Sequence, residues 1–435
     1  MNGLSLLRPR ADWFSAANLF AAGLFCLFVG IGGGAKPVAI GQIFLLFAIA
    51  KAFFERGRAT MSWRHLPPSA WCLAAFVGVS ALSVFANWQG IAAPFEHLGK
   101  LRYLAVVLVI LAMPWLAQGL LRQKWRRDSL ALAWLVPLAF AIAVGLFAYT
   151  TGNHPLRGGD VVDIRRVSGL YGQVMTFAYS LQFSVLALAG FFLAPRVWKT
   201  ATRVPWWIVV LMLLLAGAAL YLTYTRGAML GALAGLAVMA VRHSWKLGVA
   251  VALVGLAGAA FLFVQWSGQK DEPRGKGQRY LQTDSAVRLS QWRAASLAFL
   301  ERPALGWGYR NFELQSAALK ERYGFEKDVV RKRGQARQIT YFQGHAHNNV
   351  LESFASTGAF GGLVFLAFVL CWLREAWRSR YALFFAPFVA AFFVSGMFEN
   401  TFFDSEVLNC LLLLYLITQW VRAEEGRAPT IATAA

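Results

Sequence analysis

Residues 206–241 read WWIVVLMLLLAGAALYLTYTRGAMLGALAGLAVMAV, a run of about 36 residues in which Arg226 is the only charge. As a single helix this run would be about 54 Å long at 1.5 Å per residue, far beyond a hydrocarbon core of about 30 Å. It therefore predicts two membrane-spanning helices, 206–224 and 227–241, that form a tight hairpin with Arg226 at its outer tip.

The composition extends this prediction to the whole chain. Of the 435 residues, 58% are hydrophobic and only 14% are charged, against about 45–50% and about 25% in an ordinary soluble domain. The excess of apolar residues must face lipid. A net charge of +21 would suggest nucleic acid binding in a soluble protein, but runs of about 20 apolar residues separate the basic clusters and favour a membrane protein.

Apolar runs of about 17–25 residues predict about twelve spanning helices and an all-α polytopic fold. They lie at 13–31, 38–55, 69–87, 101–121, 129–150, 170–194, 206–224, 227–241, 247–266, 349–373, 381–398 and 407–421. Arg8 and Arg10 precede the first run, and no clear cleavage site follows it, so we expect this run to remain as the first helix. We find no internal repeat that would suggest the inverted halves of a transporter.

Basic residues gather in alternate connections, on the side where both termini would lie. These clusters run from Lys51 to Arg64, Arg122 to Arg127, Arg196 to Arg203, Arg242 to Lys246 and Arg374 to Arg380. The positive-inside rule makes that side cytoplasmic. The expected organisation is spans at 1–266, a large helical extracytoplasmic loop at 267–346, spans at 347–421 and a cytoplasmic tail at 422–435.

The cysteines give no sign of a disulfide or a metal site. Cys26, Cys72, Cys371 and Cys410 all lie inside apolar runs and show no CxxC spacing. We therefore expect them to be small packing residues.

Arg226 is unusual because it lies at or near membrane depth, where an arginine costs about 2.5–3.5 kcal/mol on insertion scales. Its side chain could simply reach back to the interface. Alternatively, its planar guanidinium could face an anionic group at the outer membrane surface, since this fork suits phosphate better than an ammonium does.

The long loop predicts two amphipathic helices. Ser285–Arg293 has a helical pattern that places Arg288 and Trp292 on one face, and a second stretch follows at about 311–323. Pro303 and nearby glycines end the first helix. A basic segment with Lys327, Arg331, Lys332, Arg333 and Arg337 comes next, and it could bind a polyanionic lipid head group or be a solvated loop.

The loop returns to the membrane through Gly344-His345-Ala346-His347-Asn348-Asn349. A zinc site would need three or four ligands, and no third ligand stands at a recognised spacing, so we predict no metal. A neutral imidazole with a pKa of about 6.5 could instead serve as a general base for a sugar hydroxyl. The sequence leaves open which acidic residue supports it, Glu399 or Asp404.

Beyond these residue patterns, the chain resembles the O-antigen ligase family, within the group of ligases and O-antigen polymerases that share a membrane domain and one large periplasmic loop. The family's histidine motif is matched by His347-Asn348, Gly358 and Gly361, and its register selects His347 over His345. Arg226 and the segment from Arg288 to Gly308 also resemble family positions. Arg166 looks like another, but Gly172-Gln173 stands where Pro-Asn is often expected.

The resemblance implies a fold like that of the C-type glycosyltransferases and an enzyme of the bacterial inner membrane. It implies transfer of O-antigen from undecaprenyl diphosphate to a sugar hydroxyl of lipid A-core in lipopolysaccharide biosynthesis, with inversion and without a metal or other cofactor. His347 would be the catalytic base, and Arg226 and Arg288 would bind the donor diphosphate. Arg166, Asn348 and His345 would support the site.

Three other functions fit parts of the same pattern. An O-antigen polymerase uses the same donor but extends another lipid-linked glycan, and a protein oligosaccharyltransferase is a further relative. A lipid-linked sugar flippase would also have many spans and buried positive charge. It would not need a large outer loop that ends in a histidine, and it would place charges at many mid-helix positions, which are scarce here.

Overall fold

The computed structural model describes residues 15–56, 61–116, 124–156, 166–251 with alternate residues to 257, 279–330 and 338–425, and these are almost entirely helical. The longer helices are α1 (Ala16–Gly33), α2 (Ala35–Arg56), α3 (Pro68–Ala86), α7 (Lys124–Thr151), α8 (Val174–Leu193), α10 (Trp206–Leu222), α11 (Arg226–His243), α13 (Arg279–Glu301), α15 (Asn349–Arg378), α16 (Ala382–Gly396) and α17 (Ser405–Glu425). The shorter ones are α4 (Pro94–Lys100), α5 (Arg102–Leu111), α9 (Pro195–Ala201), α14 (Phe312–Arg322) and the 3-10 turns Trp63–His65 and Trp88–Gly90.

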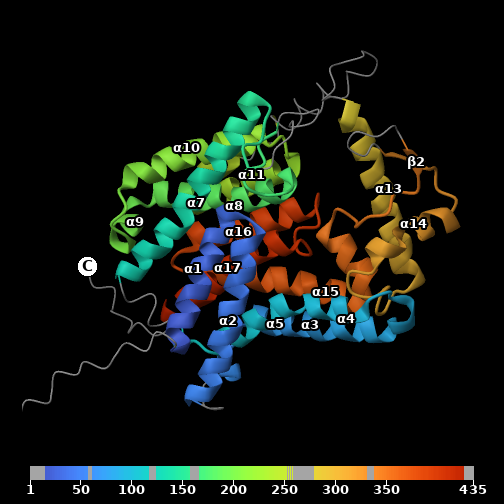
Figure 1. The fold of residues 1–435 in the computed structure, drawn as a ribbon, viewed down its shortest axis with the longest axis horizontal. Coiled ribbons are helices and arrows are strands. Elements are labelled where there is room, and N and C mark those ends of the chain that lie inside the picture. The colour runs from blue at the N-terminus through green and yellow to red at the C-terminus, as the bar shows by residue number, and fades with distance from the viewer. Residues whose placement is uncertain are drawn as a thin grey trace, which may run out of the picture.

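Helix α15 packs against helices of both the membrane bundle and the large loop, and it lies beside α3 in Figure 1. Helix α3 lies along one side of α15, and α16 lies along another. Helix α1 packs on α2 and α7, while α8 contacts α10, α11 and α16. One hydrophobic core continues through all these helices, as expected for a bundle whose outer surface faces lipid.

Seven of the described helices are long and apolar enough to span a membrane: α1, α2, α3, α7, α8, α15 and α17. The pair α9 and α10, bent by 117°, would be an eighth, and α16 is a shorter apolar helix. The protein is therefore an all-α polytopic membrane protein, but twelve spans are not established. In the predicted span 101–121, α5 ends at Leu111 and residues 117–121 lie outside the described residues. The predicted span 247–266 lies largely outside them as well.

The apolar run 206–241 breaks where the sequence predicted, but α11 is not among the candidate spans, so its prediction as a span is not confirmed. Helix α10 ends at Leu222 and α11 begins at Arg226, so three residues separate them. Tyr224 in this turn has a left-handed φ of 52°, which is uncommon for a residue with a side chain. Helix α10 packs mainly on α8, whereas α11 packs mainly on α16 and also on α8.

Three glycines spaced four residues apart let α11 lie close to α8 and α16. A Cβ at Gly227, Gly231 or Gly235 would lie within 2.6 Å of a side chain of α8, at Tyr179, Gln182 and Leu186 respectively. The same added atoms would meet Phe398, Ser395 and the Pro387 carbonyl of the α16 segment at 2.8–3.1 Å. Such small-residue stripes are a common way to pack membrane helices. The contact at Gly227 places the start of α11 against the segment that follows α16.

Helix α15 is opened at Gly358, where the backbone has φ 68° and ψ −166°. The loop segment 303–308 inserts at this break and binds the freed backbone groups. Ala359 N–H donates to the Pro303 carbonyl at 2.7 Å, and Trp307 and Gly308 N–H donate to the carbonyls of Ala355 and Ser356 at 3.0 Å each. A Cβ at Gly358 would lie 2.2 Å from the Ala304 carbonyl oxygen. The motif glycine at 358 therefore anchors the loop to a membrane helix.

The described part of the large loop has a small core of its own. Helices α13 and α14 lie at one end of the molecule with a short hairpin of β1 (Asp328–Val330) and β2 (Gln338–Thr340), as Figure 1 shows. Two helices lie where the sequence predicted them, whereas the antiparallel hairpin is an exception to the predicted all-α fold. Buried Lys320 of α14 pairs with Asp328 at 2.7 Å, and Asp328 also accepts the N–H of Phe342 at 2.9 Å. This pair fixes the strand that leads to the histidines. Residues 267–278 and 331–337, with most of the basic segment, lie outside the described residues.

Candidate active site

The candidate site forms where the large loop meets the first turn of α15. The side chain of Asn348 caps this helix, because its Oδ1 accepts the N–H groups of Val350 at 2.9 Å and Leu351 at 3.0 Å. His347, immediately before the cap, has a left-handed φ of 49°. Such a conformation costs on the order of 1 kcal/mol or more and is found often at functional sites. The ring of His347 contacts Glu399, in the segment between α16 and α17.

Two polar side chains of α15 hold this turn in place. Buried Glu352 accepts the N–H of Ala346 at 2.9 Å and the hydroxyl of Ser356 at 2.9 Å. Asn349 donates to the Thr401 hydroxyl at 2.8 Å and accepts the Phe402 N–H at 3.0 Å. The turn before α15 is thus fixed to the segment between α16 and α17.

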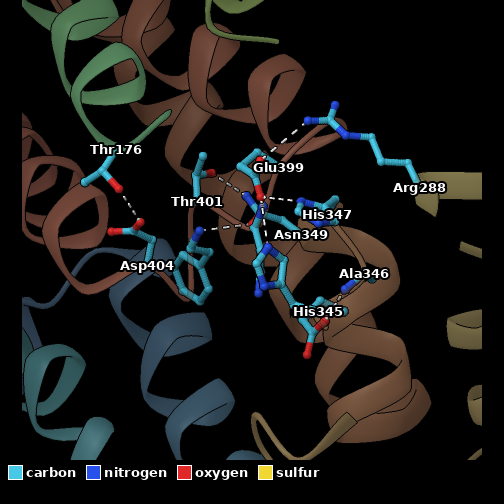
Figure 2. A network of polar contacts seen from close by, with 12 residues as sticks. Thr176, Arg288, His345, Ala346, His347, Asn349, Glu399, Thr401 and Asp404 are labelled. Carbon is cyan, nitrogen blue, oxygen red and sulfur yellow. Dashed lines mark hydrogen bonds and ion pairs between the residues drawn. The ribbon is translucent and has the colours of Figure 1, made fainter. Parts of the chain in front are cut away.

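Glu399, from the segment between α16 and α17, joins three of the side chains that the sequence singled out. Its Oε1 accepts hydrogen bonds from Nδ1 of His347 at 2.7 Å and from Nε2 of His345 at 2.9 Å. Its Oε2 lies 3.7 Å from the nearest guanidinium nitrogen of Arg288. Figure 2 shows the carboxylate at the centre, with the two imidazoles and the guanidinium directed toward it. These residues come from α13, the turn before α15 and the segment after α16.

The charge state of Glu399 determines the tautomers of both histidines. Burial alone would raise the pKa of Glu399, but the imidazole of His347 and hydrogen bonds from both histidines outweigh it and hold that pKa well below its ordinary value. An ionised carboxylate has no proton to donate. Nδ1 of His347 must therefore carry the proton, and a neutral His347 has its lone pair on Nε2.

His345 experiences opposing effects. Burial disfavours its charged form, but the hydrogen bond to Glu399 outweighs this and raises the pKa of His345. The side chains of His345 and His347 keep 31% and 19% of their surface exposed, whereas Glu399 keeps 10%. The imidazoles are thus open to solvent while the carboxylate that orients them is not.

A second basic group lies at the start of α11. Arg226 is the first residue of this helix, and the neighbouring Gly227 packs against Phe398, the residue before Glu399. Arg166 donates to the Thr223 carbonyl at 2.6 Å and to the Thr225 hydroxyl at 2.9 Å. A helix N-terminus with arginines beside it favours an anion. The break in the run 206–241 is therefore next to the glutamate of the histidine cluster.

The structure gives the candidate residues different surroundings. His345, His347 and Arg288 meet at Glu399, whereas Asn348 is engaged as a helix cap and Arg166 binds the turn before α11. Asp404, the other acidic candidate, instead accepts the hydroxyl of Thr176 and the N–H of Val407. The acidic character of the last outer turn was a signal for Glu399, but its pairing with the histidines spans more than fifty residues of sequence. The role of Glu352 had no sequence signal.

The sequence shows no third metal ligand at a recognised spacing, but the tertiary structure places Glu399 beside His345 and His347. One ligand atom from each of His345, His347 and Glu399 lies within 4.8 Å of the others. Two imidazole nitrogens and a carboxylate oxygen are a ligand set that zinc accepts.

The fold and this cluster define the protein as a polytopic all-α membrane protein with a histidine, carboxylate and arginine site at the junction of loop and membrane helices. Residues 210–366 match the family model described as O-antigen ligase, which confirms the resemblance to that family. The matched region contains Arg226, Arg288 and both histidines, but neither Arg166 nor Glu399. It supports a glycosyltransferase-like function of the O-antigen ligase or polymerase type. A search of curated proteins finds no match to this chain.

Proposed function

We propose that this protein is an O-antigen ligase that transfers O-antigen polysaccharide from undecaprenyl diphosphate to a sugar hydroxyl of lipid A-core. The observation that carries the proposal is the hydrogen bond of His347 Nδ1 to the buried carboxylate of Glu399. It gives the motif histidine one tautomer and one orientation, as a general base requires.

In the proposed reaction Nε2 of His347 takes the proton of the acceptor hydroxyl. The hydroxyl oxygen forms a bond to the anomeric carbon of the donor as the bond from that carbon to the diphosphate oxygen breaks. The products are the extended glycolipid, undecaprenyl diphosphate and an imidazolium that Glu399 stabilises. Direct displacement inverts the anomeric configuration.

The arginines would stabilise the charge that grows on the leaving diphosphate. Arg288 keeps 30% of its side chain exposed, and its 3.7 Å separation from Glu399 is an ion pair rather than a hydrogen bond. Its N–H groups are thus available to a phosphate. Arg226 and the first N–H groups of α11 would bind from the other side. Each charge-assisted hydrogen bond contributes roughly 1.5–3 kcal/mol, so the reaction needs no divalent metal.

We propose that the protein lies in the inner membrane with both termini in the cytoplasm. Residues 267–346 would form a periplasmic subdomain, and segments 1–266 and 347–421 would contain the membrane helices. The positive-inside pattern supports this orientation. The starts of α11 and α15 and the end of α16 meet at the candidate site, so all the proposed donor and acceptor contacts lie on one side. The carrier's aliphatic chain would stay in lipid beside α11.

The closest alternative is an O-antigen polymerase, because the family match supports both activities. Deleting the gene separates them: loss of a ligase leaves full-length polymer on the lipid carrier, and loss of a polymerase leaves single repeat units. A protein oligosaccharyltransferase would transfer the glycan to protein instead. A flippase, from a different class, would move the lipid-linked sugar without forming a new glycosidic bond.

The direct test is transfer by purified protein reconstituted with lipid-linked glycan and lipid A-core. We expect activity that survives EDTA and a product whose new linkage is inverted. His347→Ala should lose transfer by at least 10²–10⁴-fold, the usual contribution of a general base, while its melting temperature stays close to that of the wild type. Normal transfer by His347→Ala, or a strict requirement for a divalent ion, would refute the proposed mechanism.

A further inference from the structure

We propose that His345, His347 and Glu399 form a reversible Zn²⁺ site whose occupation blocks the active site. The binding of the ion follows from the cluster's geometry alone, whereas the inhibition rests on the proposed function. The ion would be an inhibitor, so this site is compatible with a reaction that needs no metal.

The cluster already brings three ligand atoms within 4.8 Å of one another. Nε2 of His345 and Nδ1 of His347 lie 2.9 and 2.7 Å from the same oxygen of Glu399, and the two rings lie 4.2 Å apart. Ligand atoms around a tetrahedral Zn²⁺ with bonds of about 2.0–2.1 Å are about 3.3 Å apart. The ion therefore requires the cluster to open by only about half an ångström between each nitrogen and the oxygen.

The backbone prepares this arrangement before any ion binds. His345 and His347 are two residues apart, and with His347 at a left-handed φ their rings lie side by side. Ala346 between them is held by the carboxylate of Glu352 at 2.9 Å. A metal ion would replace two hydrogen bonds without reorganising the chain, which limits the entropy cost of binding.

The surroundings set the expected affinity and stoichiometry. The exposed parts of both imidazoles allow an ion to enter, and a water molecule can complete the coordination, as in zinc sites with three protein ligands. Arg288 lies 3.7 Å from the other oxygen of Glu399 and opposes a second positive charge. We therefore expect one ion per chain, bound in the micromolar range rather than tightly.

Binding would remove the general base. A metal ion takes the lone pair of Nδ1 of His347, so the proton of the neutral ring moves from Nδ1 to Nε2. Nε2 then donates a hydrogen bond and can no longer accept the proton of a sugar hydroxyl. No bond of the substrate is made or broken, and no oxidant or reductant is involved.

The first test is a titration of the full-length protein in detergent with Zn²⁺ alone, in which calorimetry measures binding. We expect one site in the wild type and binding at least tenfold weaker in His345→Ala and Glu399→Gln. His243→Ala, which removes an exposed histidine at the far end of α11, should bind as the wild type does. Equal binding by His345→Ala and the wild type, or loss of binding in His243→Ala, would refute the site.

Co²⁺ in place of Zn²⁺ tests a rival location. Cys72 and Cys371 have sulfur atoms 4.0 Å apart and could bind a thiophilic ion. The proposed site should give the absorption of Co²⁺ with nitrogen and oxygen ligands in the visible range. A thiolate-to-cobalt charge-transfer band would place the ion at the cysteines and overturn the proposal.

The second test measures transfer against Zn²⁺ concentration. We expect Zn²⁺ to inhibit the wild type over the concentration range in which calorimetry detects binding, and EDTA to reverse this inhibition. Any residual activity of His345→Ala should be inhibited only at Zn²⁺ concentrations at least tenfold higher. Binding without inhibition would overturn the inhibitory role. Binding by a wild-type protein that transfers no glycan would instead refute the proposed function and leave the metal site standing.

Discussion

Glu375 and Glu399 are both buried carboxylates of a membrane protein, but their surroundings differ in kind. Glu375, near the end of α15, accepts the N–H of Ser69 at 2.9 Å and the amide of Gln419 at 2.7 Å, with Arg422 at 3.6 Å. Glu399 accepts two imidazoles on one oxygen, while its other oxygen has no hydrogen bond among the described residues. The first carboxylate joins three helices, and the second binds the N–H of Asn400 together with two imidazoles, the side chain that most often serves as a general base.

The difference separates a structural site from a reactive one. The network of Glu375 leaves neither carboxylate oxygen without a donor, so it stabilises the packing of α3, α15 and α17. The cluster of Glu399 combines an incompletely bonded oxygen, a left-handed backbone at His347 and partly exposed rings. Proteins place such features at sites where a substrate completes the contacts.

Exchanging the acid for its amide at each site should give the largest contrast. Glu399→Gln should lower transfer by on the order of 10²–10⁴-fold, because the imidazolium formed in the reaction loses its counter-charge. Glu375→Gln should lower stability instead, because one amide cannot accept from all three partners and a buried unsatisfied group costs about 1–3 kcal/mol. Transfer assays and melting curves on both variants measure the contrast.

If the two glutamates have the proposed roles, folded Glu375→Gln should transfer at nearly the wild-type rate. Loss of transfer in Glu375→Gln with an unchanged melting temperature, or wild-type transfer in Glu399→Gln, would remove the distinction.

Gly358→Ala should uncouple the loop from the membrane helices. Its φ of 68° disfavours a side chain by about 1 kcal/mol, and the added Cβ would overlap the Ala304 carbonyl, which costs about 1–3 kcal/mol more. We expect a lower melting temperature and weaker transfer. Gly78→Ala in α3 is the matched control, because no atom lies within 4 Å of its Cβ position. Equal melting temperatures for the two variants would contradict the anchoring role of Gly358.

Arg288→Lys tests whether Arg288 only balances the charge of Glu399. A lysine would keep the charge but not the planar fork that binds phosphate, so we expect transfer to fall by roughly tenfold or more. Arg293→Lys on the same helix, whose guanidinium stacks on the ring of Phe325 at 4.7 Å, should retain its rate. Wild-type kinetics for Arg288→Lys would leave Arg288 as a counter-ion alone.

The smallest effect is expected from a third carboxylate, Asp404 at the start of α17. Burial raises the pKa of Asp404 to about 6 although the N–H of Val407 opposes the shift. The folded state thus holds this proton more tightly than the unfolded state does. Stability from this group is full below pH 3.8 and is lost as the pH rises to about 6. The melting temperature of Asp404→Asn should therefore change less with pH than that of the wild type between these values. Equal pH dependence of the two melting temperatures would exclude Asp404 as the titrating group.

The sequence predicted features that depend on local composition. The run 206–241 is too long for one span and contains one arginine, so its break near residue 225 followed from length and charge. Helices around Arg288 and at about 311–323 were predicted from residue spacing, and the structure has α13 and α14 there. The register of the family motif selected His347 over His345. In contrast, the span 101–121 was predicted as continuous, but α5 ends at Leu111 and residues 112–114 are not helical.

Only the tertiary structure decided which residues meet. Apolar periodicity specifies that a helix is buried in lipid or protein, but lipid-facing and helix-facing residues are equally apolar, so the sequence does not specify helix neighbours. Close approach through Gly227, Gly231 and Gly235 brought the start of α11 to Phe398, and the break at Gly358 brought the loop to α15. The hydrogen bonds of Asn349 to Thr401 and Phe402 hold the turn before α15 against the segment that carries Glu399. The pairing of His347 with Glu399 turned two isolated polar residues into a candidate base with a defined tautomer.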